Sequence, residues 1–130
     1  MTHFLQDILR QPLELQSTID YLCGAGRRRL AEAAAAIRSA RHVYLTGIGS
    51  SWHVALTAGP LFSIGGRPVY VQDASELLQF ATIPSDAVII AISRTGRSVE
   101  IVRLLAKARK SGTVVIGVTN SEDGPLAQEA

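Results

Sequence analysis

The chain has 130 residues, of which 47% are hydrophobic, 18% charged and 5% aromatic, and its formal net charge is +2. This length and apolar content are typical of one compact domain and exclude a disordered, collagen-like or low-complexity chain. The longest apolar runs, such as 87–92 and 113–118, are far shorter than the roughly 20 residues that span a bilayer, and the start has no secretory signal. We therefore expect a cytoplasmic protein with no membrane partner.

The small positive charge is spread over several segments, which disfavours a nucleic-acid partner. The basic run Arg27–Arg29 opens an alanine-rich segment and is typical of a solvated helix face. Cys23 is the single cysteine, so we expect a buried or partly buried structural thiol rather than a disulfide or a Cys-rich metal site. No residues stand in pairs at metal-ligand spacing, and we predict no metal and no cofactor.

Residues 1–40 are predicted to form an N-terminal helical segment. Apolar residues recur at helical spacing over 4–9 and again over 15–22, and Pro12 between them is expected to start a second turn of helix. Two glycines then separate this part from the alanine-rich segment 27–40, which favours helix by propensity alone.

From residue 41 onward, short apolar runs rich in β-branched residues alternate with longer amphipathic segments. This alternation is typical of parallel strands joined by crossover helices, so 41–130 is predicted to be one α/β domain with sheet order 2-1-3-4. The expected strands are 42–46, 68–72, 86–93 and 113–119, and the expected helices between them are 51–64, 74–80 and 97–111.

Two of these helices carry further expectations. Pro60 stands where the first crossover helix should still be running, so a kink or an early end is expected there. In the third helix, the apolar stripe is predicted to consist of Val99, Val102, Leu105 and Ala106, with the basic residues outside it.

Two glycine-containing loops rich in hydroxyl groups follow the first and third strands. They read Thr-Gly-Ile-Gly-Ser-Ser over 46–51 and Ser-Arg-Thr-Gly-Arg-Ser over 93–98. Ligands of open parallel sheets bind at the carboxyl ends of the strands, and the order 2-1-3-4 makes these two strands neighbours. We therefore expect both loops to face one crevice.

The residue types in the two loops suit an anion such as a phosphate monoester. Glycine allows close backbone approach, a helix N-terminus presents unpaired N–H groups, and hydroxyl groups donate short hydrogen bonds. For one loop alone, helix capping and simple turn formation would be the better explanation, but two loops at one crevice favour a ligand site. The candidate donors are Ser51, Ser93, Thr95 and Ser98, and Arg94 or Arg97 supplies positive charge.

A dinucleotide site is the main alternative, since Gly47-x-Gly49 follows a strand and Asp73 ends the next one. Trp52, however, fills the third glycine position, where close helix–strand packing needs glycine. No P-loop sequence and no Gly-x-Ser-x-Gly elbow of a serine hydrolase occur.

Two side chains are weaker candidates for chemistry. His53 is predicted one turn into the first crossover helix, within reach of the crevice. Ser75 and Glu76 follow the second strand, where they more often cap and charge a helix start than move protons, so Glu76 is only a weak candidate base.

In this order and spacing, three segments resemble the sugar isomerase (SIS) domain family: Gly49-Ser50-Ser51, Ala74-Ser75-Glu76 and Ser93–Ser98. The similarity is greatest to the first SIS domain of the isomerase module of glucosamine-6-phosphate synthases, and to related double-SIS phosphosugar isomerases and deaminases. Residues Phe4–Pro12 resemble the helix that precedes that module.

The resemblance implies a three-layer, flavodoxin-like sandwich that binds a phosphosugar such as fructose 6-phosphate or glucosamine 6-phosphate. It places the phosphate at Ser93, Arg94, Thr95 and Ser98 and the sugar or its phosphate at Ser51. The synthase pattern usually has Gln and Glu at the positions of Arg94 and Arg97, a departure that bears on which phosphosugar binds. The full predicted substrate-binding set is Gly49, Ser50, Ser51, Ser93, Arg94, Thr95, Gly96 and Ser98.

The resemblance also implies a further strand and helix after residue 130, so 41–130 is expected to be truncated before its last strand and helix. We expect the chain to supply the phosphosugar-binding half of an aldose–ketose isomerase or an aminosugar-phosphate isomerase or deaminase, with weak or no activity alone. Family sites are often completed by a homodimer or a second SIS domain. The alternative is a non-catalytic phosphosugar-sensing module, although no DNA-reading helix-turn-helix is evident before Arg41.

Overall fold

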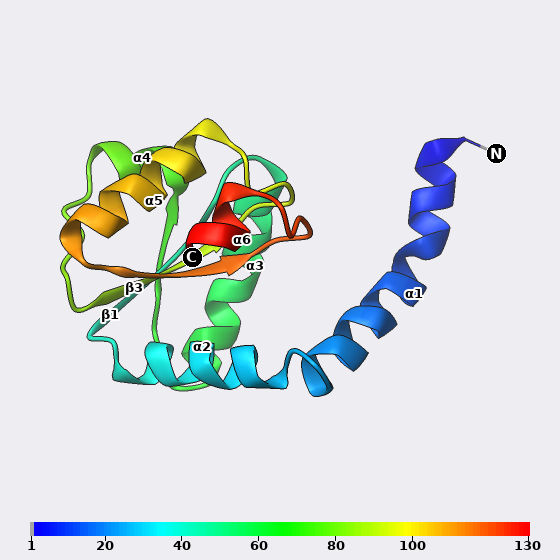
Figure 1. Cartoon of the computed structure of the whole chain (residues 1–130), viewed down its shortest axis with the longest axis horizontal. Helices are drawn as coiled ribbons and strands as arrows, with labels where there is room; N and C mark the ends of the chain where they lie inside the picture. The colour runs from blue at the N-terminus through cyan, green and yellow to red at the C-terminus, as the bar shows by residue number, and fades with distance from the viewer. Residues whose placement is uncertain (1) are drawn as a thin grey trace. The chain divides into compact units, whose positions relative to one another are not determined.

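The computed structural model describes residues 2–130 and divides into two compact units, Met1–Ala35 and Ala36–Ala130. The first unit holds α1 (His3–Cys23) and the greater part of α2 (Arg27–Ser39). The expectation that Pro12 starts a second turn of helix was wrong, because Pro12 lies inside α1, which runs through it without a break. Helix-favouring residues on both sides of Pro12 offset the one backbone hydrogen bond that proline removes, and the axis of α1 changes direction midway (Figure 1).

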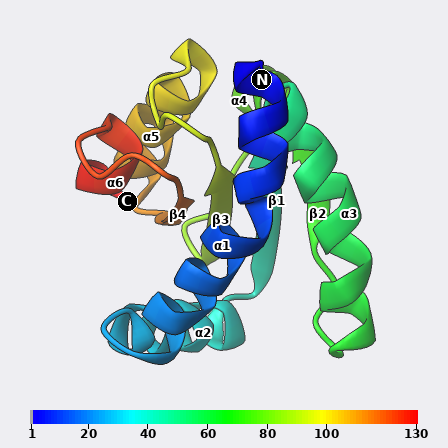
Figure 2. The ribbon, with the colours of Figure 1, turned by 90° about the vertical axis from the view of Figure 1, so that its right-hand side faces the viewer.

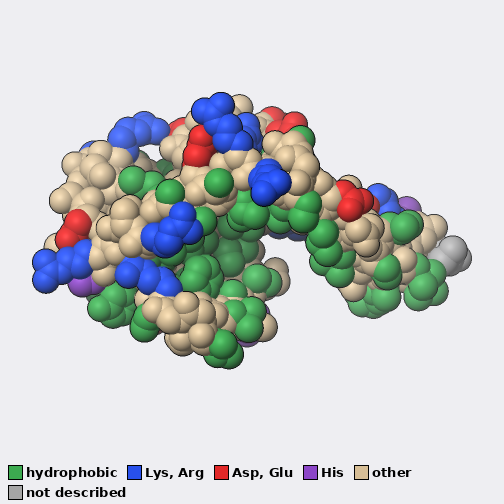
Figure 3. All heavy atoms as spheres, turned by 90° about the horizontal axis from the view of Figure 1, so that it is seen from below, with side chains coloured by type: hydrophobic (Ala, Val, Ile, Leu, Met, Phe, Trp, Pro, Cys, Tyr) green, Lys and Arg blue, Asp and Glu red, His purple; other side chains and the backbone are tan. Residues whose placement is uncertain are grey.

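No described residue of α1 is buried. The expectation of a buried or partly buried Cys23 was therefore wrong, because this thiol lies at the exposed end of an exposed helix. Hydrophobic side chains stand along the surface of α1 (Figure 3). The large exposed ones are Phe4, Leu5, Ile8, Leu9, Leu13, Leu15, Ile19 and Tyr21.

The second unit is built on a parallel sheet of four strands in the order β2-β1-β3-β4. Both the strands and their order were predicted correctly from the apolar runs, with boundaries that move by one or two residues. The strands are β1 (His42–Gly47), β2 (Tyr70–Asp73), β3 (Ala87–Ile92) and β4 (Val114–Val118).

Helices cover both faces of this sheet, so the predicted three-layer α/β sandwich is confirmed. The helix α3 (Ser50–Ile64) lies on one side of the sheet, and α5 (Val99–Ser111) and α6 (Pro125–Glu129) lie on the other (Figure 2). The short helix α4 (Ala74–Gln79) packs beside α5. Two apolar clusters hold the layers together, one centred on Ile89 and Leu104 and the other on Leu45 and Ala55.

Two expectations about helices were wrong. The helix α3 continues through Pro60 to Ile64. Leu56, whose carbonyl group loses its helical partner to Pro60, is exposed, so water can solvate that carbonyl. The buried stripe of α5 differs from the one predicted and consists of Ile101, Leu104, Leu105 and Ala108, a complete i, i+3, i+4, i+7 set.

Val99 and Val102 of the expected stripe are 60% and 38% exposed, and Ala106 is exposed as well. Only Leu105 of the four predicted residues is buried.

Within residues 2–130, no helix combines the length and the apolar character that crossing a membrane requires.

Candidate functional site

The first loop connects β1 to α3 through a very tight turn. A Cβ atom at Gly47 would lie 2.7 Å from the carbonyl carbon and oxygen of Ser51, so the strand end and the first helical turn can approach this closely only with glycine. Gly49 is the N-cap residue of α3 and has a φ of 57°. Ser50 is exposed and Ser51 half-buried, and neither hydroxyl group is hydrogen-bonded to any other described residue.

The second loop connects β3 to α5 and is organised by its own hydroxyl groups. The Ser93 side chain is buried, and its Oγ accepts a hydrogen bond from the Gly96 N–H at 3.1 Å. Thr95 Oγ1 accepts from the Arg97 N–H at 3.3 Å. A hydroxyl group that accepts from an amide still has its own hydrogen to donate, so both side chains can shape the loop and also bind an anion.

Ser98 is the N-cap residue of α5, yet its side chain makes no capping hydrogen bond. Helix capping therefore does not account for this hydroxyl group. The Ser98 side chain is half-buried at the N-terminus of a helix of 13 residues, where the helix dipole favours a negative charge.

The register of the sheet brings the two loops together. Gly47 at the end of β1 pairs with Ile92 at the end of β3, so Ile48 and Ser93 are the next residues at the same edge. Neighbouring strands lie about 4.8 Å apart. The structure thus places the loops 46–51 and 93–98 side by side at the carboxyl edge, as the order 2-1-3-4 predicted.

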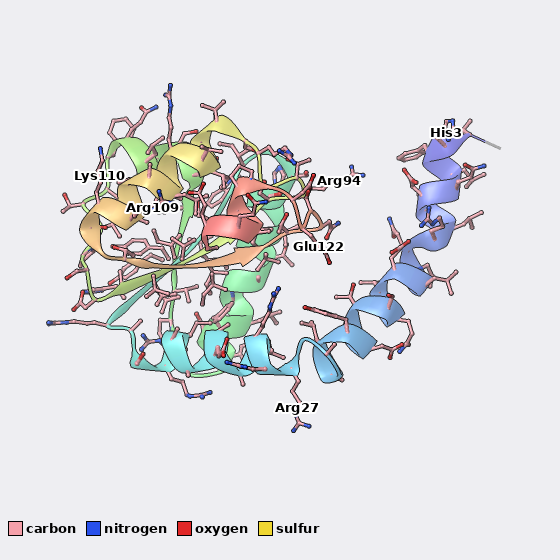
Figure 4. All side chains as sticks on the ribbon, in the orientation of Figure 1. His3, Arg27, Arg94, Arg109, Lys110 and Glu122 are labelled. Atoms are coloured by element: carbon pink, nitrogen blue, oxygen red, sulfur yellow. The ribbon has the colours of Figure 1, made fainter. Side chains whose placement is uncertain are left out.

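The two arginines of the second loop have different surroundings. Arg94 is exposed and its side chain has no hydrogen bond or ion pair with another described residue (Figure 4). The Arg97 guanidinium lies 3.0 Å from Asp123 Oδ2 and donates to the Asp123 carbonyl oxygen at 3.2 Å. The Ser121 hydroxyl group, and then the Arg97 guanidinium, hold the pKa of Asp123 below its ordinary value. Arg94 is therefore the arginine available to a ligand.

The loop after β2 contributes a capped helix start. Asp73 Oδ1 accepts a hydrogen bond from the Ser75 N–H at 2.8 Å, so Asp73 is the cap of α4 and Ser75 is not. Glu76 is exposed in the first turn of α4.

His53 is exposed and turned away from the sheet. It stands two residues before Ala55, which is fully buried against the sheet, and two residues correspond to about 200° around a helix. The structure therefore places His53 in the first turn of α3, close in sequence to the loop 46–51, on the side of the helix that faces away from the sheet. Within residues 2–130, no group of three or more His, Cys, Asp or Glu side chains is arranged to hold a metal ion.

The sequence interpretation missed the segment that follows β4. The Arg94 carbonyl oxygen accepts from the Asn120 N–H and from Thr119 Oγ1, each at 3.2 Å, and the Leu126 N–H donates to the Gly96 carbonyl oxygen at 3.3 Å. Residues 119–126 thus contact the second loop directly. The rule that carboxyl ends of parallel strands share one edge applies to the fourth strand too and could have indicated this contact.

Comparison with known proteins identifies the fold and its relatives. A family model described as SIS domain matches residues 36–130. Among curated proteins, the glutamine–fructose-6-phosphate aminotransferase (isomerizing) of Pyrobaculum aerophilum is 31% identical over 130 residues, which cover 98% of this chain and 21% of that protein. The chain therefore spans about a fifth of that relative's length.

A second relative belongs to another functional class. An uncharacterized HTH-type transcriptional regulator of Clostridium perfringens is 35% identical over 92 residues, which cover 69% of this chain and 33% of that protein. Among solved structures, the C-terminal domain of a Francisella tularensis glucosamine-fructose-6-phosphate aminotransferase superposes with a TM-score of 0.83 at 21% identity, covering 98% of this chain and 37% of that one.

Proposed function

The chain belongs to the SIS domain family, and from this premise we propose that it binds a phosphosugar in the crevice between the loops 46–51 and 93–98. The observation that carries the proposal is the pairing of Gly47 with Ile92, which sets two loops rich in hydroxyl groups side by side. A single such loop would be explained by turn formation, whereas two at one edge provide donors from two directions.

The phosphate is proposed to lie against the second loop. The N-terminus of α5 offers a favourable dipole, and Ser93, Thr95 and Ser98 can each donate an O–H. Arg94 adds a positive charge from an exposed position. Ser51, with Gly49 and Ser50, is proposed to contact the sugar or its phosphate. Gly96, with a φ of 65°, allows the turn that brings the groups of the second loop toward the ligand.

Titration calorimetry or phosphorus NMR tests the proposal, with fructose 6-phosphate and glucosamine 6-phosphate as ligands and inorganic phosphate as the control for a generic anion site. We expect saturable binding of at least one sugar phosphate, tighter than that of inorganic phosphate. Absence of binding at millimolar ligand, where a binding free energy of about −4 kcal/mol still registers, would contradict the proposal.

Variants then assign the site. Thr95→Ala and Arg94→Met are expected to weaken sugar-phosphate binding about tenfold each, because each removes a direct donor to the phosphate. Ser63→Ala is the matched control, since Ser63 is exposed at the far end of α3. If all three variants bound the sugar phosphate as tightly as the native chain, the second loop would not be part of the binding site.

The reaction proposed for the complete protein is an aldose–ketose isomerisation or an aminosugar-phosphate isomerisation or deamination. The Pyrobaculum aerophilum relative is by name an isomerizing aminotransferase of glutamine and fructose 6-phosphate, which supports this class. Isomerisation needs a base that moves a proton between neighbouring carbons. Glu76, exposed at the start of α4, is the weak candidate for that base, and Glu76→Gln tests it through turnover at unchanged ligand affinity.

A second candidate function is phosphosugar sensing without turnover. The similarity to a transcriptional regulator of Clostridium perfringens, at 35% identity, favours it. Both candidates share the binding site and differ in chemistry. Turnover of fructose 6-phosphate by the full native polypeptide distinguishes an isomerase from a sensor that binds the same ligand and leaves it unchanged.

The partner proposed for the chain is a second copy of itself or a second SIS domain. The large apolar side chains exposed along α1 support a packing role for residues 1–40, with 41–130 as the binding domain. Cytoplasmic localisation remains part of the proposal and fits a sugar-phosphate ligand. Sedimentation velocity, with Phe4→Ser and Leu9→Ser as disrupting variants, measures the proposed association.

A further inference from the structure

The loop 93–98 is held from outside by the segment 119–126, which we call the brace. Three backbone groups of the loop are engaged: the Ser93 N–H donates to the Val118 carbonyl oxygen at 3.0 Å just before the brace begins, and the carbonyl groups of Arg94 and Gly96 accept from the brace itself. These contacts tie the backbone of the loop down at both ends of its turn.

At Gly124 the brace lies so close to the loop that no side chain fits between the two backbones. A Cβ atom at Gly124 would lie 2.5 Å from the Thr95 carbonyl oxygen. Thr95 is also one of the proposed phosphate donors. The brace therefore contacts the backbone of a residue that is proposed to bind the ligand. In Figure 4, Glu122 of the brace and Arg94 of the loop lie at the same edge of the domain.

An ion pair between Asp123 and Arg97 also joins the brace to the loop. Arg97 donates to both the carboxylate and the backbone carbonyl group of Asp123. Asp123 Oδ1 in turn accepts from the Ser121 hydroxyl group at 2.7 Å, and the Ser121 N–H donates to Thr119 Oγ1 at 3.2 Å. Ser121 thus connects Asp123, through its side chain, with Thr119, through its backbone N–H, and the Thr119 hydroxyl group donates to the Arg94 carbonyl oxygen.

We propose that Asp123 and Thr119 are positioning residues of the phosphosugar site, which hold the loop 93–98 in its anion-binding conformation and keep Arg97 away from the phosphate. This inference rests on the proposed function. It assigns the two loop arginines opposite roles: Arg94 binds the ligand, and Arg97 anchors the loop. Both residues would otherwise count equally as phosphate ligands.

The physical basis is pre-organisation. A loop that is already ordered loses less conformational freedom when the ligand binds, so part of the binding free energy depends on contacts that never touch the ligand. The Asp123–Arg97 pair is exposed, with 53% of the Arg97 and 80% of the Asp123 side chain accessible, and exposed pairs contribute little each. A modest loss of affinity is therefore expected from one variant.

The test measures fructose 6-phosphate affinity of the full chain with the variants Asp123→Asn and Thr119→Val. Each is expected to weaken binding about three- to fivefold, with an unchanged thermal midpoint and faster amide exchange at Gly96 and Arg97. The matched control is Glu129→Gln, which breaks the Arg109–Glu129 ion pair between α5 and α6, outside the loop, and should leave affinity unchanged.

A charge swap separates anchoring from direct contact. If Arg97 anchors the loop, Arg97→Glu combined with Asp123→Arg restores the ion pair and brings affinity back to within about twofold of the native value, because only the pairing matters. If Arg97 instead binds the phosphate, the swap stays weak, since a glutamate then faces the ligand. Unchanged or tighter binding by Asp123→Asn would also overturn the inference.

The outcomes also distinguish this inference from the proposed function. If the native chain binds no sugar phosphate, the proposed function fails, and amide exchange in the ligand-free chain still decides the positioning role: faster exchange at Gly96 and Arg97 in Asp123→Asn supports it, and identical exchange overturns it. If the native chain binds and Asp123→Asn binds equally well, the positioning role alone fails.

Discussion

Thr46 and Gln72 lie side by side across β1 and β2, and each has a buried polar atom without a hydrogen-bond partner among the described residues. The Thr46 side chain is fully buried, and the unpartnered atoms are its Oγ1 and Gln72 Oε1. A hydroxyl group that is buried without a partner lowers stability, because folding removes it from water without replacing its hydrogen bonds.

Thr46→Val is therefore expected to raise the free energy of unfolding by about 1 kcal/mol, since it replaces the hydroxyl group with a methyl group of similar shape. Urea unfolding followed by circular dichroism measures this change. Thr46→Ser is the control: it keeps the hydroxyl group, loses the methyl group and should lower stability. If Thr46→Val destabilised the chain instead, the hydroxyl group would have a hydrogen-bond partner in solution.

Lys107 connects α5 to the end of α4. Its ammonium group donates to three carbonyl oxygens, those of Leu77 at 3.2 Å, Leu78 at 2.8 Å and Ala81 at 2.6 Å. A cation at a helix C-terminus satisfies carbonyl groups that lack helical partners and interacts favourably with the helix dipole.

Lys107→Met keeps most of the side-chain stem and removes the ammonium group, so we expect a loss of about 1–2 kcal/mol of stability. The loss should be accompanied by faster amide exchange in α4, which has only six residues. Lys110→Met, on the exposed side of α5, is the matched control and should change neither quantity. Equal effects of the two variants would show that the three contacts contribute nothing specific.

The stability of the domain should depend on Tyr44 at alkaline pH. Burial, and then the negative charges that Tyr70 and Asp86 can carry, raise the pKa of Tyr44 above its ordinary value of 10.0. The unfolded chain therefore ionises this phenol first. The contribution of the neutral Tyr44 phenol to the free energy of unfolding is fully present below about pH 10. It is lost as the pH rises through the pKa of Tyr44 in the folded state.

Tyr44→Phe is expected to remove this alkaline loss, so that its unfolding free energy falls less between about pH 9 and 11 than that of the native chain. Urea unfolding at several pH values measures both slopes. Tyr21→Phe, on the exposed surface of α1, is the control. Parallel slopes for native chain and Tyr44→Phe would mean that Tyr44 titrates alike in the folded and unfolded states.

The two glycines of the turn after β1 are needed for different physical reasons. Gly47→Ala is expected to cost about 2–3 kcal/mol, because the added methyl group would overlap backbone atoms of Ser51 that cannot move alone. At Gly49 an added methyl group meets open space, but φ 57° with ψ −125° is a backbone conformation that residues other than glycine rarely adopt, so Gly49→Ala is expected to cost about 1–3 kcal/mol through backbone strain. Thermal unfolding measures both losses, and an unchanged midpoint for either variant would contradict the reason given for it.

The sheet could be predicted from the sequence because each strand is a short apolar run between turn residues, and because parallel order follows from the crossover helices. The same reasoning placed Ser51 and Ser93 at one edge. Sequence reasoning failed where two sets of apolar residues both fit the period of one helix. In α5, Val99 and Val102 fit a helical period, but so do Ile101 and Leu104, and only the contact with the sheet decides which set is buried.

The partners of individual polar side chains could not be predicted. Lys107 resembles its exposed basic neighbours in sequence, and its contacts with α4 depend on how two helices pack. Arg97 and Arg94 are likewise equivalent in sequence, and their surroundings differ because the chain after β4 returns beside the loop and brings Asp123 to Arg97. Sequence periodicity carries no information about such contacts between distant segments.

The strands β1 and β3 are neighbours in the sheet although β2 lies between them in the sequence. This arrangement makes the proposed binding of a ligand depend on folding. A crevice shared by the ends of these strands exists only after the intervening crossover has folded and the long loop between them has closed, which is a slow step in parallel sheets. A ligand held there would bridge two halves of the chain, so denaturation midpoints should rise with the logarithm of its concentration. Partly unfolded forms, in which this strand pair has opened, would release it.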